Sequence, residues 1–150
     1  IEKGLDKILY STFISYIPND KIKINLDNKS DKRGSFFELL KTQSSGQLSY
    51  FTVKPGIERG GHYHHVKVEK FFVISGKAEF KFIDIRTKKS FKIRVSSLNP
   101  QIIYSKPGYF HKIKNIGKEE LISILWSSEI YDPKRSDTYI DYKWIKKLNY

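Results

Sequence analysis

Three histidines and one glutamate have the types and spacing of a metal site. His62 and His64 stand two residues apart within the segment 56–76, Glu69 follows in the same segment, and His111 comes much later in the chain. Side chains two apart on a strand point to the same face, so both imidazoles can reach one point inside a sheet structure. Three imidazole nitrogens and one carboxylate oxygen suit Zn, Ni, Mn, Fe or Cu, and they do not choose among these metals.

Each of these residues also has a simpler role open to it. A lone histidine on a strand is more often a hydrogen-bonded structural residue than a ligand, and Glu69 alone could be a surface charge. However, all four histidines of the chain fall into two short segments, and only His65 is left over. Its odd spacing points it to the opposite face unless a bulge turns it inward. The clustering favours a bound metal over an empty polar pocket.

The elements that must position these residues read as β-strands. From Gln47 onward, short alternating or apolar runs are separated by turn residues. The predicted strands are 47–53, 70–75, 78–85, 90–95, 101–105, 110–115 and 121–127. Strand after strand without a helical interruption implies antiparallel pairing in a sandwich or barrel. We therefore predict an all-β domain over residues 31–150.

Residues 1–30 are predicted to form an N-terminal connecting segment. Apolar side chains at helical spacing predict a short amphipathic helix over 4–17, ending before Pro18. The run KIKIN at 21–25 alternates as a short strand. At the other end, the stretch after Trp126 is expected to add a loop and one covering strand.

Composition limits the compartment and the partners. The chain has no cysteine, which excludes disulfides and thiolate metal sites. No apolar run approaches the roughly 18 residues that span a bilayer, so we expect a cytoplasmic protein without a membrane partner. The formal charge is +12, but the lysines are spread along strands without a tight basic run. This pattern favours a solvated face first, a phosphate-bearing ligand second and nucleic acid last.

Two segments match the motifs of a known family. GIERGGHYHHVKVEKFFVISG resembles the first cupin motif at every fixed position. These positions are Gly56, His62, His64, Glu69 and Gly76. PGYFHKIKN resembles the second motif, with Gly108, His111 and Asn115 in place, although Pro107 abuts Gly108 instead of standing two residues before it. The two motifs together imply a cupin: a small double-stranded β-helix, or jelly-roll barrel, with a metal in its mouth.

The flanking segments narrow this resemblance. DKRGSFFELLKT, GQLSYFTVKPG and ILWSSEIYDPKRSDTY look like the C-terminal cupin domain of the bifunctional UDP-4-keto-sugar epimerase/reductases of capsule and O-antigen synthesis, the CapF type. In that family an NADPH-using short-chain reductase domain lies upstream. The cupin domain epimerises C3 of a UDP-4-keto-6-deoxy-2-acetamido sugar.

The resemblance implies the cofactors and partners of this chain as well. It implies a UDP-sugar substrate, a divalent transition metal (zinc, with nickel, manganese or iron as alternatives) and no nicotinamide cofactor in this domain. It also implies a homodimer and an upstream reductase domain. The chain begins at Ile1 and contains no methionine, which we read as a segment trimmed from a longer product.

Epimerisation next to a ketone requires a base and a group that stabilises the enolate oxygen. A metal held by the three histidines and Glu69 could act as the Lewis acid, or it could be structural. Three residues are candidates for the base. Lys70 adjoins the site in sequence, Tyr109 lies in the second motif, and His65 has a suitable native pKa if a bulge turns it inward.

A second resemblance concerns the substrate. RGSFFE is similar to the R-G-x-F-x-E stretch of the related dTDP-4-keto-rhamnose-type 3,5-epimerases. It implies that Arg33 pairs with a phosphate or carboxylate and that Glu38 accepts a donor from sugar or base. The simpler alternative is a tight turn at Gly34 with an ordinary salt bridge. The aromatic residues expected near the mouth, where a uracil or sugar face could stack, are Tyr63, Tyr109, Phe110 and Trp126.

The same epimerases carry R-G-x-H-Y, which Arg59, Gly60, His62 and Tyr63 match here. The match implies that Arg59 and Tyr63 help to bind the substrate. There the histidine is the base and no metal is used, so the two resemblances conflict over His62. We favour the ligand role, because the other three ligands are unneeded for a metal-free base. The alternatives to C3 epimerisation are a sugar 3,4-ketoisomerase, a cupin dioxygenase and a non-catalytic sugar-binding cupin.

Overall fold

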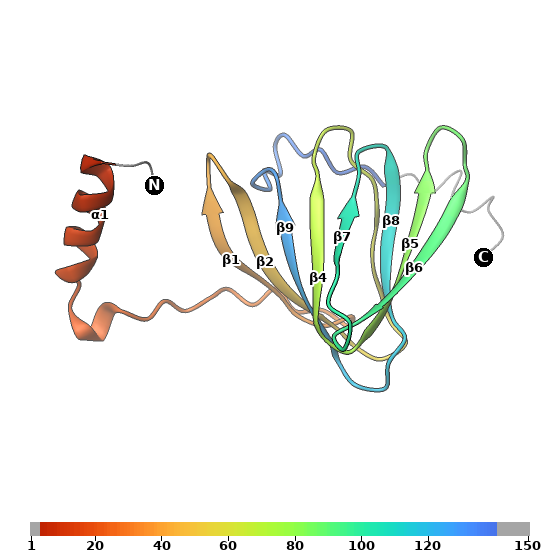
Figure 1. Ribbon diagram of the computed structural model, residues 1–150, viewed down its shortest axis with the longest axis horizontal. Coiled ribbons are helices and arrows are strands. Elements are labelled where there is room, and N and C mark those ends of the chain that lie inside the picture. Colours follow the sequence, from red (N-terminus) through yellow and green to blue (C-terminus); the bar gives the residue numbers. More distant parts are fainter. Residues whose placement is uncertain (1–3, 141–150) are drawn as a thin grey trace.

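The computed structural model describes residues 4–140, which form a helix followed by two antiparallel sheets (Figure 1). The helical elements are α1 (Leu5–Ser15) and the short 3-10 turn η1 (Asn19–Lys21). The strands are β1 (Phe36–Thr42), β2 (Gly46–Val53), β3 (Glu58–His62), β4 (Glu69–Ser75), β5 (Lys77–Asp84), β6 (Ser90–Ser96), β7 (Ile102–Ser105), β8 (Tyr109–Asn115) and β9 (Leu121–Ser127). Within this part of the chain, no helix is long and apolar enough to cross a membrane.

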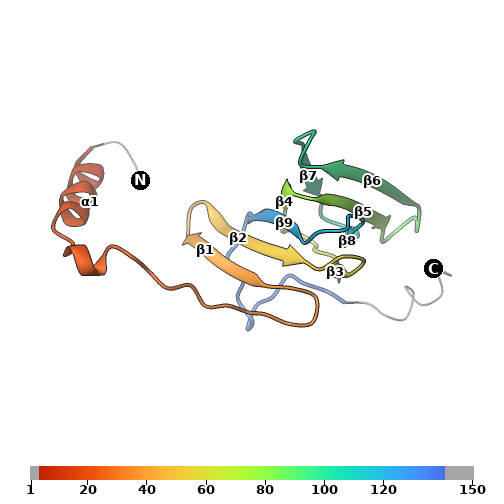
Figure 2. The same cartoon turned by 90° about the horizontal axis from the view of Figure 1, so that it is seen from below.

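The strand order of each sheet mixes early and late strands. One sheet runs β1-β2-β9-β4-β7 and the other runs β3-β8-β5-β6. Figure 2 shows the two sheets as separate layers. This order brings β9 between β2 and β4, so residues far apart in sequence become neighbours. The all-β prediction is confirmed, and β9 has the predicted bounds.

Alternation along the strands sorts side chains between the core and the outer faces. In β4, Glu69, Phe71 and Val73 are buried, whereas the residues between them are more exposed. The side chains that fill the core come from both sheets. They are Phe51, Val53, Phe71, Val73, Ala78, Phe80, Phe82, Val95, Ile103, Ile113 and Leu121. The inward position of Glu69 is therefore set by the same period that buries its apolar neighbours.

The N-terminal segment differs from its prediction in two ways. The helix is present as α1, but none of its residues is buried, and Figure 1 shows it apart from the sheets. The predicted strand at 21–25 is wrong: Lys21 ends η1, and the residues after it have no regular structure. A strand needs a hydrogen-bonded neighbour, and this segment pairs with none of the described strands. The division of the chain into a connecting segment, 1–30, and a cupin domain, 31–150, remains a prediction.

Two further differences lie at the edges of the domain. The first sheet begins with β1, which is absent from the predicted strands because FFELLKT lacks strict alternation. The covering strand expected after Trp126 is reduced, within the described residues, to one isolated bridge between Tyr63 and Tyr139. The remainder of that stretch, 141–150, lies outside the described residues.

Candidate metal centre

The fold brings His62, His64, Glu69 and His111 into one cluster. One ligand atom from each residue lies within 4.8 Å of those of the other three. His62 ends β3, Glu69 begins β4 and His111 lies in β8, where it is paired with His62 across a bulge. His64 is not on the same strand as His62, as the spacing argument assumed, but in the loop that follows β3. The bulge and the loop, rather than strand alternation, aim both imidazoles at one point.

Two of the imidazoles are anchored through their Nδ1 atoms. Nδ1 of His64 contacts the main-chain carbonyl oxygen of Asp137, and Nδ1 of His111 lies 2.8 Å from the Ser105 hydroxyl. A carbonyl oxygen can only accept, so we assign the proton of neutral His64 to Nδ1. Nε2 of His64 then presents a lone pair to the cluster.

The lone pair of His64 Nε2 faces a lone pair of the Glu69 carboxylate. Nε2 of His64 and Nε2 of His111 lie 3.3 and 3.1 Å from the same oxygen, Oε2 of Glu69. Despite these short distances, His64 Nε2 and Glu69 Oε2 lack a partner with hydrogen-bond geometry, and both are buried. Two acceptors that face each other in the interior repel unless a cation lies between them. The cluster therefore fits a bound metal ion, and a proton is the alternative occupant.

The charge states of the cluster also suit a metal. Burial by itself would raise the pKa of Glu69, but the contacts with His111 and His64 outweigh it and hold that pKa well below its usual range. Burial, followed by the nearby His111, lowers the pKa of His62 to about 3. Metal ions bind carboxylates and neutral imidazoles. Near neutral pH, Glu69 is charged and His62 is neutral without any proton having to leave.

Three members of the cluster, His62, Glu69 and His111, line a cavity of about 450 Å³. Apolar side chains, including Phe36, Phe51, Phe71 and Leu125, line one part of it. The charged side chains Lys29, Asp31, Arg33 and Arg59 line another. This size and this mixture of apolar wall and a few convergent polar groups are typical of small-molecule sites.

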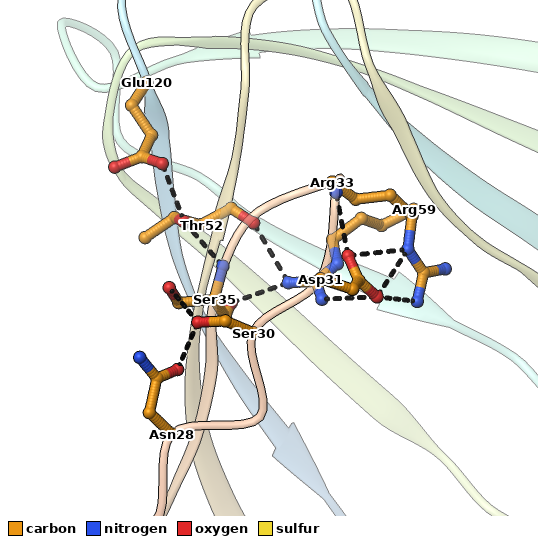
Figure 3. A network of polar contacts seen from close by, with 8 residues as sticks. All are labelled: Asn28, Ser30, Asp31, Arg33, Ser35, Thr52, Arg59 and Glu120. Carbon is orange, nitrogen blue, oxygen red and sulfur yellow. Dashed lines mark hydrogen bonds and ion pairs between the residues drawn. The ribbon is translucent and has the colours of Figure 1, made fainter.

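The charged part of the cavity is a network of ion pairs and carbonyl contacts (Figure 3). Arg33 contacts the Asp31 carboxylate through Nη2 at 2.6 Å and Nε at 3.0 Å. Arg59 donates from Nη1 to the main-chain oxygens of Ser35 and Thr52, at 2.6 and 3.0 Å, and its Nη2 lies 3.7 Å from Asp31. The side-chain hydrogen bonds from Arg33 are the main cause that lowers the pKa of Asp31 to about 2. The arginines are thus held in place around one carboxylate.

Arg33 and Arg59 are the two predicted substrate-binding residues that line this cavity. Glu38 does not line it, because its carboxylate pairs with Lys29 at 2.9 Å and Lys41 at 2.7 Å. Trp126 also lies elsewhere, on the outer face of the first sheet, where its indole donates to the Ser45 carbonyl.

The three base candidates likewise lie away from the cavity lining. Lys70 follows the inward-facing Glu69, so alternation sends it outward, where its ammonium lies 4.7 Å from the centre of the Trp126 ring. His65 is exposed, and no bulge turns it inward; its ring packs against Tyr63 and Tyr139. Tyr63 itself stacks on Tyr139.

Tyr109, the third candidate, lies at the edge of the core. Its ring contacts Phe91 edge-on, and the ammonium of Lys106 lies 4.8 Å from its centre. Asp137 and Ser105, which anchor two of the imidazoles, are functional residues that the sequence reasoning missed. Asp137 lies 73 positions from His64, so no local spacing indicates it, whereas Ser105 lies six positions before His111 but carries no motif signal of its own.

Comparison with known proteins places this site in a family. Residues 29–139 match the family described as "Polysaccharide biosynthesis C-terminal domain". A UDP-2-acetamido-2,6-beta-L-arabino-hexul-4-ose reductase from Pseudomonas aeruginosa is 44% identical over 139 residues, which are 93% of this chain and 37% of that protein.

Solved structures agree with this assignment. The crystal structure of the capsular polysaccharide assembling protein CapF from Staphylococcus aureus matches with a TM-score of 0.85 and 39% identity, over 90% of this chain and 39% of CapF. The cupin domain of CENP-C from Drosophila melanogaster matches with a TM-score of 0.60 and 12% identity, over 84% of this chain and all of that one, which shows the fold alone. This chain therefore spans well under half the length of the reductase and of CapF. The predicted cupin fold is confirmed, and the chain belongs to the polysaccharide biosynthesis C-terminal domain family.

Proposed function

We propose that this chain is the epimerase domain of a sugar-nucleotide enzyme of capsule or O-antigen synthesis. In this proposal it exchanges the proton at C3 of a UDP-linked 4-keto-6-deoxy-2-acetamido sugar. The observation that carries the proposal is the composition of one cavity, which three members of the His/Glu cluster line in one part and two arginines line in another. The 4-keto sugar in the name of the Pseudomonas relative supports the substrate class.

The cluster would hold the metal through His62, His64, Glu69 and His111. Zinc is our first choice, with nickel, manganese or iron as alternatives. Bound there, the ion would supply positive charge to the ketone oxygen as the C3 proton leaves. Glu69 keeps its negative charge in the site because its pKa is lowered, and the anchored imidazole of His64 keeps its orientation.

The arginines would bind the diphosphate of the substrate. Arg59 is already fixed by two main-chain carbonyl oxygens, which leave its positive charge largely uncompensated. Among the described residues, its ion-pair partner is Asp31, at 3.7 Å. A phosphate group could therefore share the guanidinium with little rearrangement. The phenylalanines of the cavity would cover the apolar face of the sugar and exclude water.

The catalytic base must contact the substrate, so only residues that line the cavity are candidates for it. Among the described residues, the ionisable groups there besides the cluster and the arginines are Lys29 and Asp31, and both are engaged in ion pairs. His62 is the cluster member whose ring has no hydrogen bond to a described residue, so its ring nitrogens are open to a substrate, but its pKa of about 3 makes it a weak base. We propose that His62 is a metal ligand. Its alternative role is that of the catalytic base.

Metal analysis separates these two roles of His62. If His62 is a ligand, we expect His62→Asn and His111→Asn each to bind metal at least tenfold more weakly than wild type. If His62 is only the base, His62→Asn keeps the metal affinity of the wild-type chain and loses proton exchange. His65→Asn is the matched control for metal content, because this exposed histidine lies outside the cluster and should leave the metal bound.

The reaction itself is tested by incubating the chain with the UDP-4-keto sugar in deuterium oxide. We expect deuterium to appear at C3, with loss of that exchange in Glu69→Gln. A product whose keto group has moved to C3 would instead identify a 3,4-ketoisomerase, and oxygen consumption would identify a dioxygenase. Binding of the UDP-sugar without any exchange would make the chain a binding module and overturn the proposal.

Two partners belong to the same proposal. Because the chain matches 37% of a longer protein named as a reductase, we propose that a reductase domain accompanies it in the natural enzyme. We also propose that the chain forms a homodimer in the cytoplasm. Light scattering on the purified chain tests the dimer, since a monomer would have a mass of 17.7 kDa.

A further inference from the structure

The segment 128–139 crosses the loop that carries His64, and we call this segment the strap. It leaves the end of β9 and, in Figure 2, runs as a blue-violet coil below the sheets. At one end, the Ser128 amide donates to Val68 and the Ser128 hydroxyl accepts from the Val68 amide, at 2.9 and 3.0 Å. At the other end, Tyr139 and Tyr63 exchange two main-chain hydrogen bonds of 3.0 Å. The strap is thus tied to both ends of the loop 63–68.

Asp137 ties the middle of the strap to the middle of the loop. Its carboxylate accepts the main-chain N–H groups of His65, Val66 and Lys67, at 2.9, 2.8 and 2.8 Å. Three charge-assisted hydrogen bonds to one side chain are a strong local constraint. Burial would raise the pKa of Asp137, but these main-chain donors outweigh it and lower that pKa. The carboxylate therefore stays charged near neutral pH.

The same residue also holds the imidazole. The main-chain oxygen of Asp137 accepts from Nδ1 of His64, which directs Nε2 toward Glu69. The loop needs such support, because His64 lies beyond β3 and outside the hydrogen-bonded strands. Besides the strap, one main-chain bond holds His64, from the Gly108 N–H to the His64 carbonyl at 2.7 Å.

We propose that Asp137 is a positioning residue of the metal centre. Its carboxylate fixes the course of the loop and thereby keeps His64 against the main-chain oxygen that sets the tautomer of its ring. This inference rests on the proposed function, since it assumes that the cluster binds a metal. Residues that orient a ligand from behind typically change metal affinity by about 10–100-fold when they are replaced. Asp137 should act in this range although it offers no atom to the cluster.

The test compares the wild-type chain with Asp137→Ala, Asp137→Asn and Asp132→Asn. Asp132 is the matched control: it lies in the same strap, and its carboxylate accepts from the Lys134 N–H at 2.9 Å, away from the loop. Zn²⁺ and Co²⁺ affinities are measured by competition with a chromophoric chelator. The visible absorption spectrum of each variant is recorded at saturating Co²⁺, because it reports the ligand geometry.

We expect Asp137→Ala to bind Co²⁺ about 10–100-fold more weakly than wild type and to show a changed spectrum. Asp137→Asn keeps the shape and part of the accepting capacity of the carboxylate, so its affinity should fall between the two. Asp132→Asn should match wild type in both measurements. Amide hydrogen exchange in the metal-free protein should show at least tenfold faster exchange at residues 65–67 in Asp137→Ala only.

Three results would overturn the inference, and they differ in what else they overturn. If both Asp137 variants keep the wild-type affinity and the wild-type Co²⁺ spectrum, the positioning role is wrong while the metal centre stands. If the wild-type chain itself binds neither metal, the proposed metal centre is wrong, and so is the positioning role that depends on it. A lower melting temperature of Asp137→Ala with unchanged affinity and spectrum would assign the residue to the stability of the strap alone.

Discussion

Replacement of Asn115 by alanine is expected to lower the free energy of unfolding by about 3 kcal/mol. Asn115 is fully buried at the end of β8. Its side-chain amide donates to the main-chain oxygens of Val53 and Glu119, each at 2.8 Å, and its side-chain oxygen accepts from the Gly117 N–H at 2.8 Å. One side chain thereby joins the end of β2 to the turn between β8 and β9.

The magnitude follows from the number of contacts. A hydrogen bond within a protein contributes about 1 kcal/mol net, so loss of three costs about 3 kcal/mol. Asn115→Asp should cost more at neutral pH, because a carboxylate oxygen then faces the Val53 and Glu119 carbonyls without a proton between them. The difference between the two variants should shrink at acidic pH, where a protonated aspartate can donate one hydrogen bond.

Urea unfolding followed by tryptophan fluorescence measures these free energies. Asn99→Ala is the matched control, since Asn99 is exposed and should change stability by no more than about 0.5 kcal/mol. A loss of less than about 1 kcal/mol in Asn115→Ala would refute the reasoning. In that case the three hydrogen bonds of the side chain would not explain why the second cupin motif has asparagine at this position.

Three other predictions concern the region around the arginines. Because the pKa of Asp31 is lowered to about 2 from 3.8, its contribution to stability should be present above pH 4 and be lost as the pH falls through 2. The urea unfolding free energies of wild type and Asp31→Asn should therefore approach each other between pH 4 and pH 2, and a difference that stays constant over this range would contradict this. Gly34→Ala should cost about 2 kcal/mol and lower the melting temperature by about 4–8 °C, because Gly34 has a φ of +139° and an added Cβ would lie 2.4 Å from the Thr52 oxygen; an unchanged thermal scan would argue against it. Arg59→Lys should weaken UDP binding about tenfold in calorimetry, since lysine lacks the planar fork that contacts carbonyl and phosphate together; equal affinity would remove Arg59 from the binding site.

The strands were the most predictable part of the molecule. β9 has the predicted bounds, and β4 differs from its prediction by one residue, because burial on one face of a strand imposes a period of two on the residue types. The run KIKIN has the same period without forming a strand, since alternation does not supply a neighbouring strand. The exposed face of α1 likewise could not be foreseen from helical spacing, which indicates a face but not what covers it.

The sequence predicted the candidate metal ligands of the site. It did not predict the residues that anchor these ligands or the positions of the base candidates. The motif spacings indicated His62, His64, Glu69 and His111, and the fold gathers all four. Lys70 was nominated by adjacency in sequence, although adjacent residues of a strand face opposite sides. Because Lys70 follows the ligand Glu69 on the same strand, its side chain points away from the metal cluster.

By itself, the sequence determined which residue types are available and how they repeat along each strand. Histidine, glutamate and arginine limited the chemistry, and the period of two separated core from surface. Only the tertiary structure decided which distant residues meet: Asp137 reaches His64 across 73 positions, and Ser127 of β9 lies beside Glu69 of β4. The reason is that such contacts depend on the order of strands within the sheets, and this order is a property of the whole chain that no local spacing contains.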